Sequence, residues 1–567
     1  MKRLWNALRS GSPFALAGVL ATLCGMAAGH LIASLLKPAS SPVLAVGSTV
    51  IDLTPTPLKE YAVREFGTKD KPILLASVMA VTLLLAAVAG LLARRWFPVG
   101  AGLLIALVAL AGAAAVTRPL ATASDVVPSL VAAVVGLVVL VLLVRLLNGS
   151  REPADEPAQA AAEEDPAPTH SAGGPVGPSP AGGTGPFDVM SNLEPIARRK
   201  PRSKSKSKSA PTAAPRASRR TLLITTGLVA AASATMGWAG EKIIAYRTRI
   251  GNVNLPPAAK PIAPLPAGLE NVYSGISNFQ TSTDRFYRVD INLTLPVVPV
   301  DDWKLTIDGD VDSSFSLTFD ELAAMPLIER DITMTCVSNE VGGRYIGAAR
   351  WLGVPLTDLL DRAGVGSKAD QILSTAVDGF TISTPLEVAR DGRDAMVAIG
   401  MNGEPLPAEH GFPARLITPG LYGFVGATKW LTRLTLTTYD DDSAYWTDRD
   451  WATDAPIKIS SRIDTPKPLA TIKDGQTVIG GVAWAQRVGI NKVEVRIDGN
   501  AWQEATLGPD AGIDYWRQWY LPWDASPGQH MLAVRATSLD GEVQTAARAT
   551  PFPEGSSGVQ EIVVTVE

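Results

Sequence analysis

The 567-residue chain has little cysteine and little histidine, with two of the first and four of the second. Two cysteines can form at most one disulfide bond. Cys24 lies in a long apolar run, whereas Cys336 lies in a distant polar segment that is rich in glycine. We therefore do not expect the two to pair, and the fold does not depend on a framework of disulfides.

The same scarcity excludes several kinds of metal site. One cysteine and one suitable histidine outside the apolar runs are fewer than the three or four ligands of a zinc site. The apolar runs hold a single histidine, His30, although a b-type cytochrome needs two. The sequence also has no haem-binding cysteine pair, no cysteine cluster for an iron–sulfur centre and no glycine-rich nucleotide loop after a strand. We expect neither haem nor an iron–sulfur cluster.

Long apolar runs are what the first quarter of the sequence has in abundance. Four of them contain no acid or base, and each approaches the roughly 20 residues needed to cross about 30 Å of hydrocarbon. A fifth run follows a strongly basic stretch. The sequence therefore predicts a multi-pass protein of the plasma membrane, in contact with the lipid bilayer through five transmembrane helices at residues 14–36, 73–93, 99–116, 126–144 and 221–240.

The segment between the fourth and fifth runs, residues 148–220, is rich in proline, alanine, glycine and serine, acidic at first and then basic. Such a segment cannot bury enough apolar surface to fold, so we predict a disordered linker. Its basic block, the basic residues before the first run, and Arg94 with Arg95 favour the cytoplasmic side. The fifth span then places residues 241–567 outside the cytoplasm. The external loop 37–72 carries five basic residues against this rule, partly offset by acids.

Arg219 and Arg220 stand directly before the fifth run and look like a twin-arginine export signal. The alternative is the ordinary basic flank of a membrane helix. A twin-arginine signal is an address for proteins that fold around a cofactor before export, so the choice depends on whether the exported part holds one.

Residues 241–567, the part predicted to be exported, show two different patterns of apolar and polar residues. Short β-type runs are first mixed with helical patterns such as "TFDELAAMP", which is typical of an α+β domain. Later strands alternate apolar with polar residues between turn residues, which is the pattern of a β-sandwich of about 110 residues. We therefore expect a four-helix membrane region at 1–147, the linker at 148–220, the fifth helix at 221–240, an α+β domain at 241–454 and a β-sandwich at 455–567.

Cys336 follows a β-type run, "DITMT", and an isolated cysteine in that setting is ordinarily a small buried hydrophobe. A catalytic thiolate would need a histidine, and His530 enters a strand of the sandwich. His410 lies instead in a loop crowded with glycine and proline that also carries Arg415 and Lys429. Such a loop offers cations and backbone donors to an anionic ligand. A metal that brings its own ligands would need only one thiolate from the protein.

Five motifs occur in order along the second half of the chain: "RFYRVD", the Cys336 segment with "ARWLGVPL", "MNGEPLPAEHGFPARLITPG", "TKWL" and "GVAWAQRVGINKVEVRIDG". With them, residues 285–567 resemble the sulfite oxidase family of molybdenum enzymes. In that family a pterin dithiolene supplies two sulfurs to molybdenum and one protein cysteine supplies a third. Soft thiolates suit a polarizable metal, and the phosphate of the pterin needs cationic donors.

The resemblance implies a molybdenum–molybdopterin cofactor and a role for particular residues. Cys336 would ligate the metal, and Arg487 would reach the catalytic centre from the sandwich. The cofactor-binding residues carried over by position are Phe286, Tyr287, Arg288, Cys336, His410, Arg415, Thr428 and Lys429.

The resemblance also implies an oxidoreductase that transfers an oxygen atom to or from a small-molecule substrate. Single electrons would pass to or from a separate carrier, a quinone or a small redox protein. The family's C-terminal sandwich is immunoglobulin-like and mediates dimers, so a homodimer is plausible, although the spans could enforce another arrangement. No nucleic acid is expected as a partner. A cofactor assembled in the cytoplasm favours the twin-arginine interpretation of Arg219 and Arg220.

Two positions depart from the family's pattern. Glu340 replaces an arginine that holds an anionic substrate, and Phe380 replaces a tyrosine and cannot donate a hydrogen bond. Arg344 or Arg350 could restore positive charge, although a structural or surface role is the ordinary expectation for each. These departures disfavour sulfite as the substrate. They leave open a sulfoxide-type reductase of the same family, and a cofactor-less binding or assembly module that keeps the fold.

Overall fold

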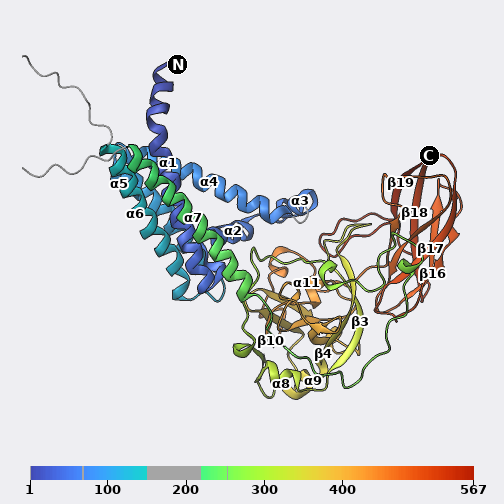
Figure 1. Ribbon diagram of the computed structural model, residues 1–567. Helices are drawn as coiled ribbons and strands as arrows, with labels where there is room; N and C mark the ends of the chain where they lie inside the picture. Colours follow the sequence, from blue (N-terminus) through green and yellow to red (C-terminus); the bar gives the residue numbers. More distant parts are fainter. Residues whose placement is uncertain (1, 67–68, 150–218, 252) are drawn as a thin grey trace, which may run out of the picture.

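The computed structural model describes residues 2–66, 69–149, 219–251 and 253–567, so almost all of the predicted linker lies outside the described residues. Figure 1 shows a helical bundle, a central domain and a C-terminal domain, in that order along the chain. The bundle helices are α1 (Lys2–Leu35), α2 (Pro42–Leu53), α3 (Thr56–Phe66), α4 (Asp70–Ala93), α5 (Phe97–Val116), α6 (Val127–Gly149) and α7 (Arg219–Arg247).

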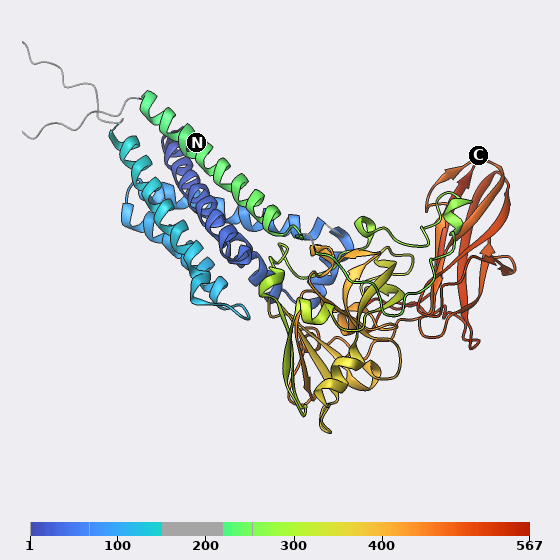
Figure 2. The same cartoon turned by 60° about the horizontal axis from the view of Figure 1, so that its bottom comes forward.

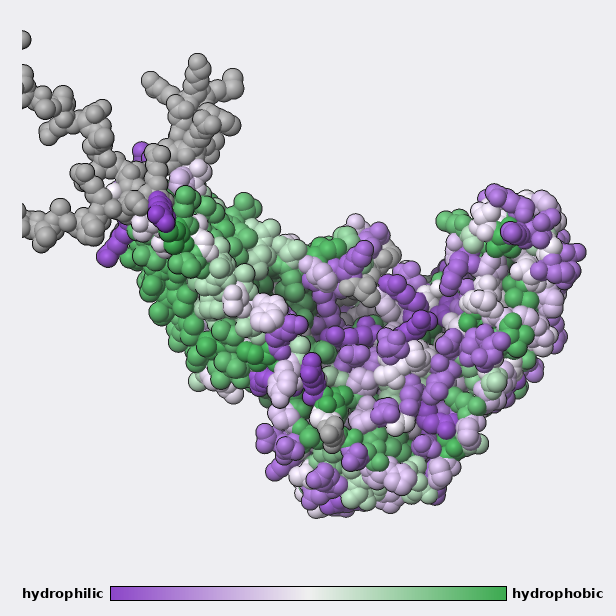
Figure 3. All heavy atoms as spheres, in the orientation of Figure 1, coloured by the Kyte–Doolittle hydropathy of each residue, from purple (hydrophilic) through white to green (hydrophobic). Residues whose placement is uncertain are grey.

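Five helical stretches of the described residues are long and apolar enough to cross a membrane, and they coincide with the five predicted spans. They are Gly11–Leu35, Asp70–Ala93, Phe97–Val116, Ala123–Gly149 and Arg220–Arg247. The last helix continues past the predicted end at residue 240. Large apolar side chains face outward from the bundle, and Figure 3 shows this surface as the apolar part of the molecule, while the other two domains are mixed.

Small residues allow the bundle helices to approach closely. A Cβ atom added to Gly18 of α1 would lie 2.1 Å from the Ala86 carbonyl oxygen of α4, and one added to Gly90 would lie 2.0 Å from the Phe14 carbonyl oxygen. Close backbone contact of this kind is how helices pack in lipid, where burial of apolar surface gives no net drive.

The central domain contains two five-stranded sheets and short helices. One sheet has the order β2-β1-β10-β5-β6, and the other has the order β3-β4-β7-β8, with β9 paired to β7. Apolar side chains between these elements, including Leu305, Leu359 and Val397, form its main core. The strands are β1 (Lys304–Gly309), β2 (Phe315–Thr318), β3 (Ile328–Thr335), β4 (Ile346–Pro355), β5 (Gln371–Ala376), β6 (Thr381–Pro385), β7 (Met396–Met401), β8 (Glu404–Pro405), β9 (Arg415–Ile417) and β10 (Leu431–Thr437).

Helices are a minor part of the central domain, so its predicted α+β character holds with strands in the majority. The longest is α9 (Leu356–Ala363), and the others are α8 (Phe319–Ala323), α10 (Leu386–Ala389) and α11 (Gly423–Gly426). Thr318 caps α8, because its hydroxyl accepts from the Glu321 amide while the Glu321 carboxylate accepts from the Thr318 amide.

The C-terminal domain is a sandwich of two sheets, as the alternating pattern predicts. Their orders are β11-β13-β17-β16 and β12-β19-β18-β14-β15. Trp519, Val493 and Val534 lie in the core between them. Its likeness to immunoglobulin domains stays a prediction. The strands are β11 (Ser460–Thr465), β12 (Thr471–Ile472), β13 (Gly475–Trp484), β14 (Ile490–Ile497), β15 (Gln503–Glu504), β16 (Thr506–Leu507), β17 (Arg517–Ala525), β18 (Gly528–Ser538) and β19 (Gln560–Val566).

A segment without regular strands, residues 253–300, joins the bundle to the central domain and runs along the central and C-terminal domains (Figure 2). The Phe279 carbonyl oxygen accepts hydrogen bonds from the Tyr515 hydroxyl (2.9 Å) and the Trp516 indole (2.8 Å) of the sandwich. The Thr281 amide donates to the Ala348 carbonyl oxygen of β4 (2.8 Å). These contacts lead the chain to Phe286, which packs against Gly347 and Trp351 of β4.

Candidate cofactor site

Cys336 directly follows β3 at the start of the loop that leads to β4. Its amide donates to the Tyr345 carbonyl oxygen (2.9 Å), and the Asn339 amide donates to the Cys336 carbonyl oxygen (3.0 Å). The loop reverses through Gly342, whose φ of +77° is unfavourable for residues with a side chain. Gly342 and Gly343 therefore close a tight loop that holds Cys336 in place, with the cysteine side chain buried.

The electrostatic setting of Cys336 matters for its chemistry. Burial raises the pKa of the thiol, while the Ser338 amide and hydroxyl and the Lys429 ammonium act in the opposite direction. Without further positive charge the group remains a thiol. A bound metal cation would deprotonate it, because a coordinating thiol exists as the thiolate.

Aromatic rings form one wall of the site. Phe286 stacks on Tyr287 with ring centroids 5.2 Å apart, and it meets the edges of Trp351 (5.6 Å) and His410 (5.5 Å). Gly347 of β4 is needed beneath Phe286, because an added Cβ atom would lie 2.9 Å from the Phe286 ring. Phe286, Tyr287 and His410, which were predicted to bind the cofactor, therefore lie together although they come from distant parts of the chain.

Arg415 is a buried cation without a carboxylate partner among the described residues. Its guanidinium donates to the carbonyl oxygens of His410 (3.1 Å) and Ala427 (3.4 Å), and its Nε atom has no partner. The guanidinium carbon lies 5.2 Å from the centre of the Trp351 ring. Burial lowers the pKa of Arg415 to about 10, against the opposing effect of Tyr287. A buried cation of this kind is costly unless an anion joins it.

Lys429 adds a second cation. Its ammonium lies 2.8 Å from Asp290 Oδ2 and 3.2 Å from the Glu409 carbonyl oxygen. Burial lowers the pKa of Lys429 to about 8 despite the nearby Asp290. Burial alone would raise the pKa of Asp290, but Lys429, Lys71 and Arg288 hold it far below its usual range.

His410 is buried and neutral. Burial, followed by the nearby charges of Arg415 and Lys429, lowers the pKa of His410 to about 4, although a bond to Thr283 opposes the shift. The Nε2 atom lies 3.1 Å from the Thr283 carbonyl oxygen and therefore carries the proton that it donates. The Nδ1 atom is then left as an acceptor.

Three of the residues predicted to bind the cofactor or to act in catalysis have partners outside the group formed by Phe286, His410 and Arg415. The Thr428 hydroxyl lies 2.5 Å from the Ser374 hydroxyl in the core, so it fixes the loop. Arg288 bonds Asp290 through Nε at 2.7 Å and is partly exposed. Arg487 lies at the junction with the sandwich, 2.9 Å from Asp514, and its side chain packs beside Gly420. The catalytic role of Arg487 therefore stays a prediction.

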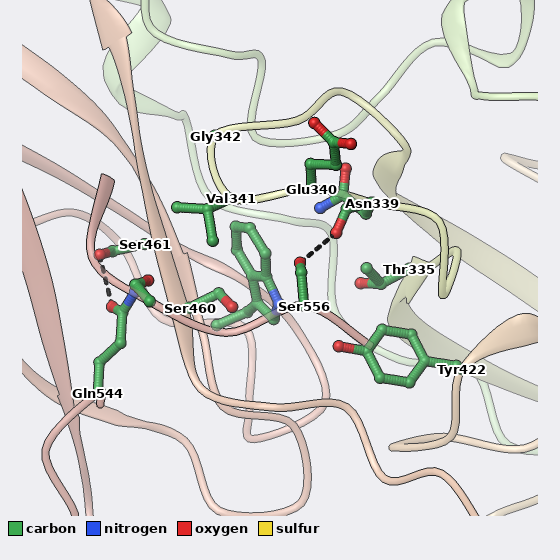
Figure 4. A pocket seen from close by; sticks show the side chains of 12 residues that line it. Thr335, Asn339, Glu340, Val341, Gly342, Tyr422, Ser460, Ser461, Gln544 and Ser556 are labelled. Carbon is green, nitrogen blue, oxygen red and sulfur yellow. Dashed lines mark hydrogen bonds between the residues drawn. The ribbon is translucent and has the colours of Figure 1, made fainter. Parts of the chain in front are cut away.

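A polar pocket lies between the Cys336 loop and the sandwich (Figure 4). Its lining includes Thr335, which directly precedes Cys336 and whose buried hydroxyl has no partner. The Ser556 hydroxyl donates to the Asn339 carbonyl oxygen (2.5 Å) and ties the loop to the sandwich. Glu340 is the one charged residue of the lining and is exposed.

The structure also shows the neighbours of Phe380, which departs from the family pattern, and of the two arginines considered as replacements for the missing positive charge. The Phe380 ring lies 5.2 Å from Tyr445 in an aromatic cluster. Arg350 is held by Asp331 at 2.8 Å, so its role is structural. Arg344 is exposed.

Sequence reasoning missed three residues of the site. Asp290 binds Lys429, Trp351 lies under Arg415, and Lys71 reaches Asp290 from α4 of the helical bundle. Asp290 and Trp351 could have been predicted from the sequence, because they belong to the motifs "RFYRVD" and "ARWLGVPL". Lys71 belonged to the unexplained basic residues of loop 37–72, and only the folded chain shows its partner.

The residues present fit a molybdopterin cofactor. Arg415 and Lys429 are buried cations that would hold its phosphate, and Cys336 would offer it a soft sulfur ligand. The unpartnered Nε atom of Arg415 is a buried donor that an anionic ligand would satisfy.

Comparisons with known proteins agree with this chemistry. Residues 292–446 match the family described as "Oxidoreductase molybdopterin binding domain". Mitochondrial sulfite oxidase of Rattus norvegicus is 28% identical over 296 residues, which are 44% of this chain and 54% of that protein. Nitrate reductase [NADH] 2 of Nicotiana tabacum is 33% identical over 174 residues, 26% of this chain and 19% of that protein.

Among solved structures, the sulfane dehydrogenase SoxCD from Paracoccus pantotrophus matches with a TM-score of 0.46 and 26% identity, covering 52% of this chain and 84% of that one. The chain spans about half the length of the sulfite oxidases that it matches.

Proposed function

We propose, from the premise that this chain carries a molybdopterin-binding domain of the sulfite oxidase family, that it is a membrane-anchored molybdenum-cofactor-dependent oxidoreductase. It transfers an oxygen atom to or from a small substrate and exchanges electrons with a separate carrier. The observation that carries the proposal is the buried, unpaired Arg415 beside His410, Lys429 and the Cys336 loop.

Each group of this site has a chemical task. When bound, the cofactor supplies two-electron oxygen-atom transfer. Arg415 and Lys429 bind its phosphate, because both present N–H donors in a buried setting. Neutral His410 donates from Nε2 to Thr283 and so keeps Nδ1 as an acceptor. The stacked rings of Phe286 and Tyr287 exclude water from this wall.

Several features support an extracytoplasmic domain held by five membrane spans. The Arg247 guanidinium at the end of α7 donates to the Ser34 carbonyl oxygen near the end of α1 (2.5 Å), so both helices end on the side of the central domain. Arg94 and Arg95 directly follow the C-terminal end of α4, which is the end away from the central domain (Figure 1). This arrangement suits the positive-inside rule and export through a twin-arginine signal at Arg219 and Arg220.

Two of the five basic residues of loop 37–72 have carboxylate partners. Lys37 lies 3.2 Å from Asp125, and Lys71 lies 2.9 Å from Asp290. The Asp125 carboxylate offsets the charge of Lys37, and Lys71 binds a carboxylate of the central domain, so these two lysines oppose an external loop less than free charges would. The electron carrier, a quinone or a redox protein, and a homodimer through the immunoglobulin-like sandwich remain part of this proposal.

A sulfoxide-type reductase is the second candidate, and the pocket between the Cys336 loop and the sandwich favours it. The lining is made of hydroxyls, amides and apolar groups, with the negative Glu340 at its exposed side. Such a lining suits a neutral substrate better than an anion. A cofactor-less binding module is less favoured, because it gives no use to the buried charge of Arg415.

The proposed function is tested by elemental mass spectrometry and pterin analysis of the full chain, purified in detergent from a host that makes molybdopterin. We expect molybdenum and pterin near one per chain, and a changed absorption spectrum in Cys336→Ser. A well-folded chain that contains neither would overturn the enzymatic proposal and leave the binding module.

A further inference from the structure

One carboxylate connects the candidate cofactor site to the membrane helices. Lys71 stands in the first turn of α4, and its ammonium lies 2.9 Å from Asp290 Oδ1 and 2.8 Å from the Asn292 carbonyl oxygen. The Asp290 side chain is 5% exposed and that of Lys71 is 28% exposed. The contact is therefore largely enclosed where the two parts of the chain meet.

Asp290 is shared among three cations. Its Oδ2 atom lies 2.8 Å from the Lys429 ammonium and 2.7 Å from Arg288 Nε, while Oδ1 binds Lys71. One negative charge cannot neutralise three positive ones. Together with Arg415, this cluster keeps an excess of positive charge at the place proposed for the cofactor phosphate.

The hydrogen bonds of Lys429 leave one donor for a ligand. An ammonium group has three N–H donors, and Asp290 and the Glu409 carbonyl oxygen accept two of them. How firmly Asp290 holds Lys429 depends on what else that carboxylate binds. Lys71 is the partner that comes from the membrane bundle.

We infer that Lys71 is a positioning residue for the cofactor phosphate, because it shares Asp290 with Lys429 and adds one positive charge to the cluster. This inference rests on the proposed function and names the membrane region as part of the cofactor site. Without Lys71, the carboxylate of Asp290 would be left to Arg288 and Lys429. Lys429 would then be held more tightly, and the cluster would attract an anion less strongly.

The test is the rate at which the cofactor leaves the full chain in detergent. Lys71→Met removes the charge at similar length, Lys71→Gln keeps a polar group, and Lys71→Arg keeps the charge. Two controls are matched to them. Tyr445→Phe removes a 3.1 Å hydrogen bond to Asp52 that joins the same two regions away from the cluster. Lys69→Met removes an exposed charge two residues away.

Cofactor release is followed after dilution by pterin fluorescence and by the molybdenum left on the protein. We expect release about 3- to 10-fold faster in Lys71→Met and Lys71→Gln, as for the loss of one charge partner, and near-native release in Lys71→Arg and both controls. Native release should also accelerate more steeply with salt than release from Lys71→Met.

The outcomes separate this inference from the proposed function. A native chain that holds the cofactor while both uncharged variants release it at the native rate overturns the role of Lys71 alone. Equal acceleration in Tyr445→Phe also overturns it, because the contact would then only hold the two regions together. A native chain without cofactor overturns the proposed function and this inference with it.

Discussion

The guanidinium carbon of Arg415 lies 5.2 Å from the centre of the Trp351 ring, and no carboxylate among the described residues pairs with this arginine. The ring face gives a cation partial compensation, which is worth more when both groups are desolvated. It does not satisfy the unpartnered Nε atom. The protein therefore keeps a charge that is unfavourable in the empty site and favourable when an anion is bound.

Replacing Arg415 by methionine tests this interpretation. We expect Arg415→Met to reduce the cofactor content more than about tenfold, because truncating one partner of a buried charged contact costs about 2–5 kcal/mol. The cofactor-free chain should unfold at the same or a higher temperature, since a buried unpaired charge is removed. Pterin content and thermal unfolding measure the two effects. A lower unfolding temperature in the cofactor-free variant would show that Arg415 is a structural residue.

Cofactor retention should weaken at alkaline pH through Lys429. Its pKa is about 8 in the folded chain, below the usual value of 10.5. A bound phosphate raises that pKa, so the loss of positive charge begins at or above pH 8. We expect pterin release to accelerate above this pH in the native chain and to stay flat to higher pH in Lys429→Arg. The same alkaline acceleration in both proteins would contradict the assignment.

Acid should destabilise the cofactor-free chain through His410. Its pKa is about 4 in the folded chain against 6.5 for the free side chain, so between these values the unfolded state binds more protons. Stability is therefore fully present above about pH 6.5 and is lost as the pH falls toward 4. His410→Gln should reduce the slope of unfolding temperature against pH in that window. An unchanged slope would assign the acid sensitivity to other groups.

Much of this site could be predicted because its residues belong to local motifs. The loop of Cys336 and the loop with His410, Arg415 and Lys429 each carry chemistry over a short stretch. The five long apolar helices were predictable for a similar reason, since length and apolar composition decide them.

What escaped prediction depends on contacts between distant segments. Lys71 and Asp290 are far apart in the sequence, and their pairing depends on how α4 meets the central domain. Arg487 shows the opposite case: a residue assigned by position alone has Asp514 as its partner, so sequence did not foresee its surroundings. Contacts between domains leave no local pattern in the sequence, so these pairings could not be predicted from it.

The charge of Glu340 should set which substrates the site accepts. It is an exposed residue of the polar pocket between the Cys336 loop and the sandwich, and a negative charge in this place should repel an approaching anion. We expect Glu340→Arg to raise kcat/KM for sulfite about 3- to 10-fold at low ionic strength, because the change reverses a charge that steers the substrate. Turnover of a neutral sulfoxide should change little, and Glu340→Gln should give an intermediate effect. The gain should fall as salt is added, since exposed charges are screened. A gain that persists in high salt, or that is equal for the neutral substrate, would show that Glu340 acts on the shape of the loop and not through its charge.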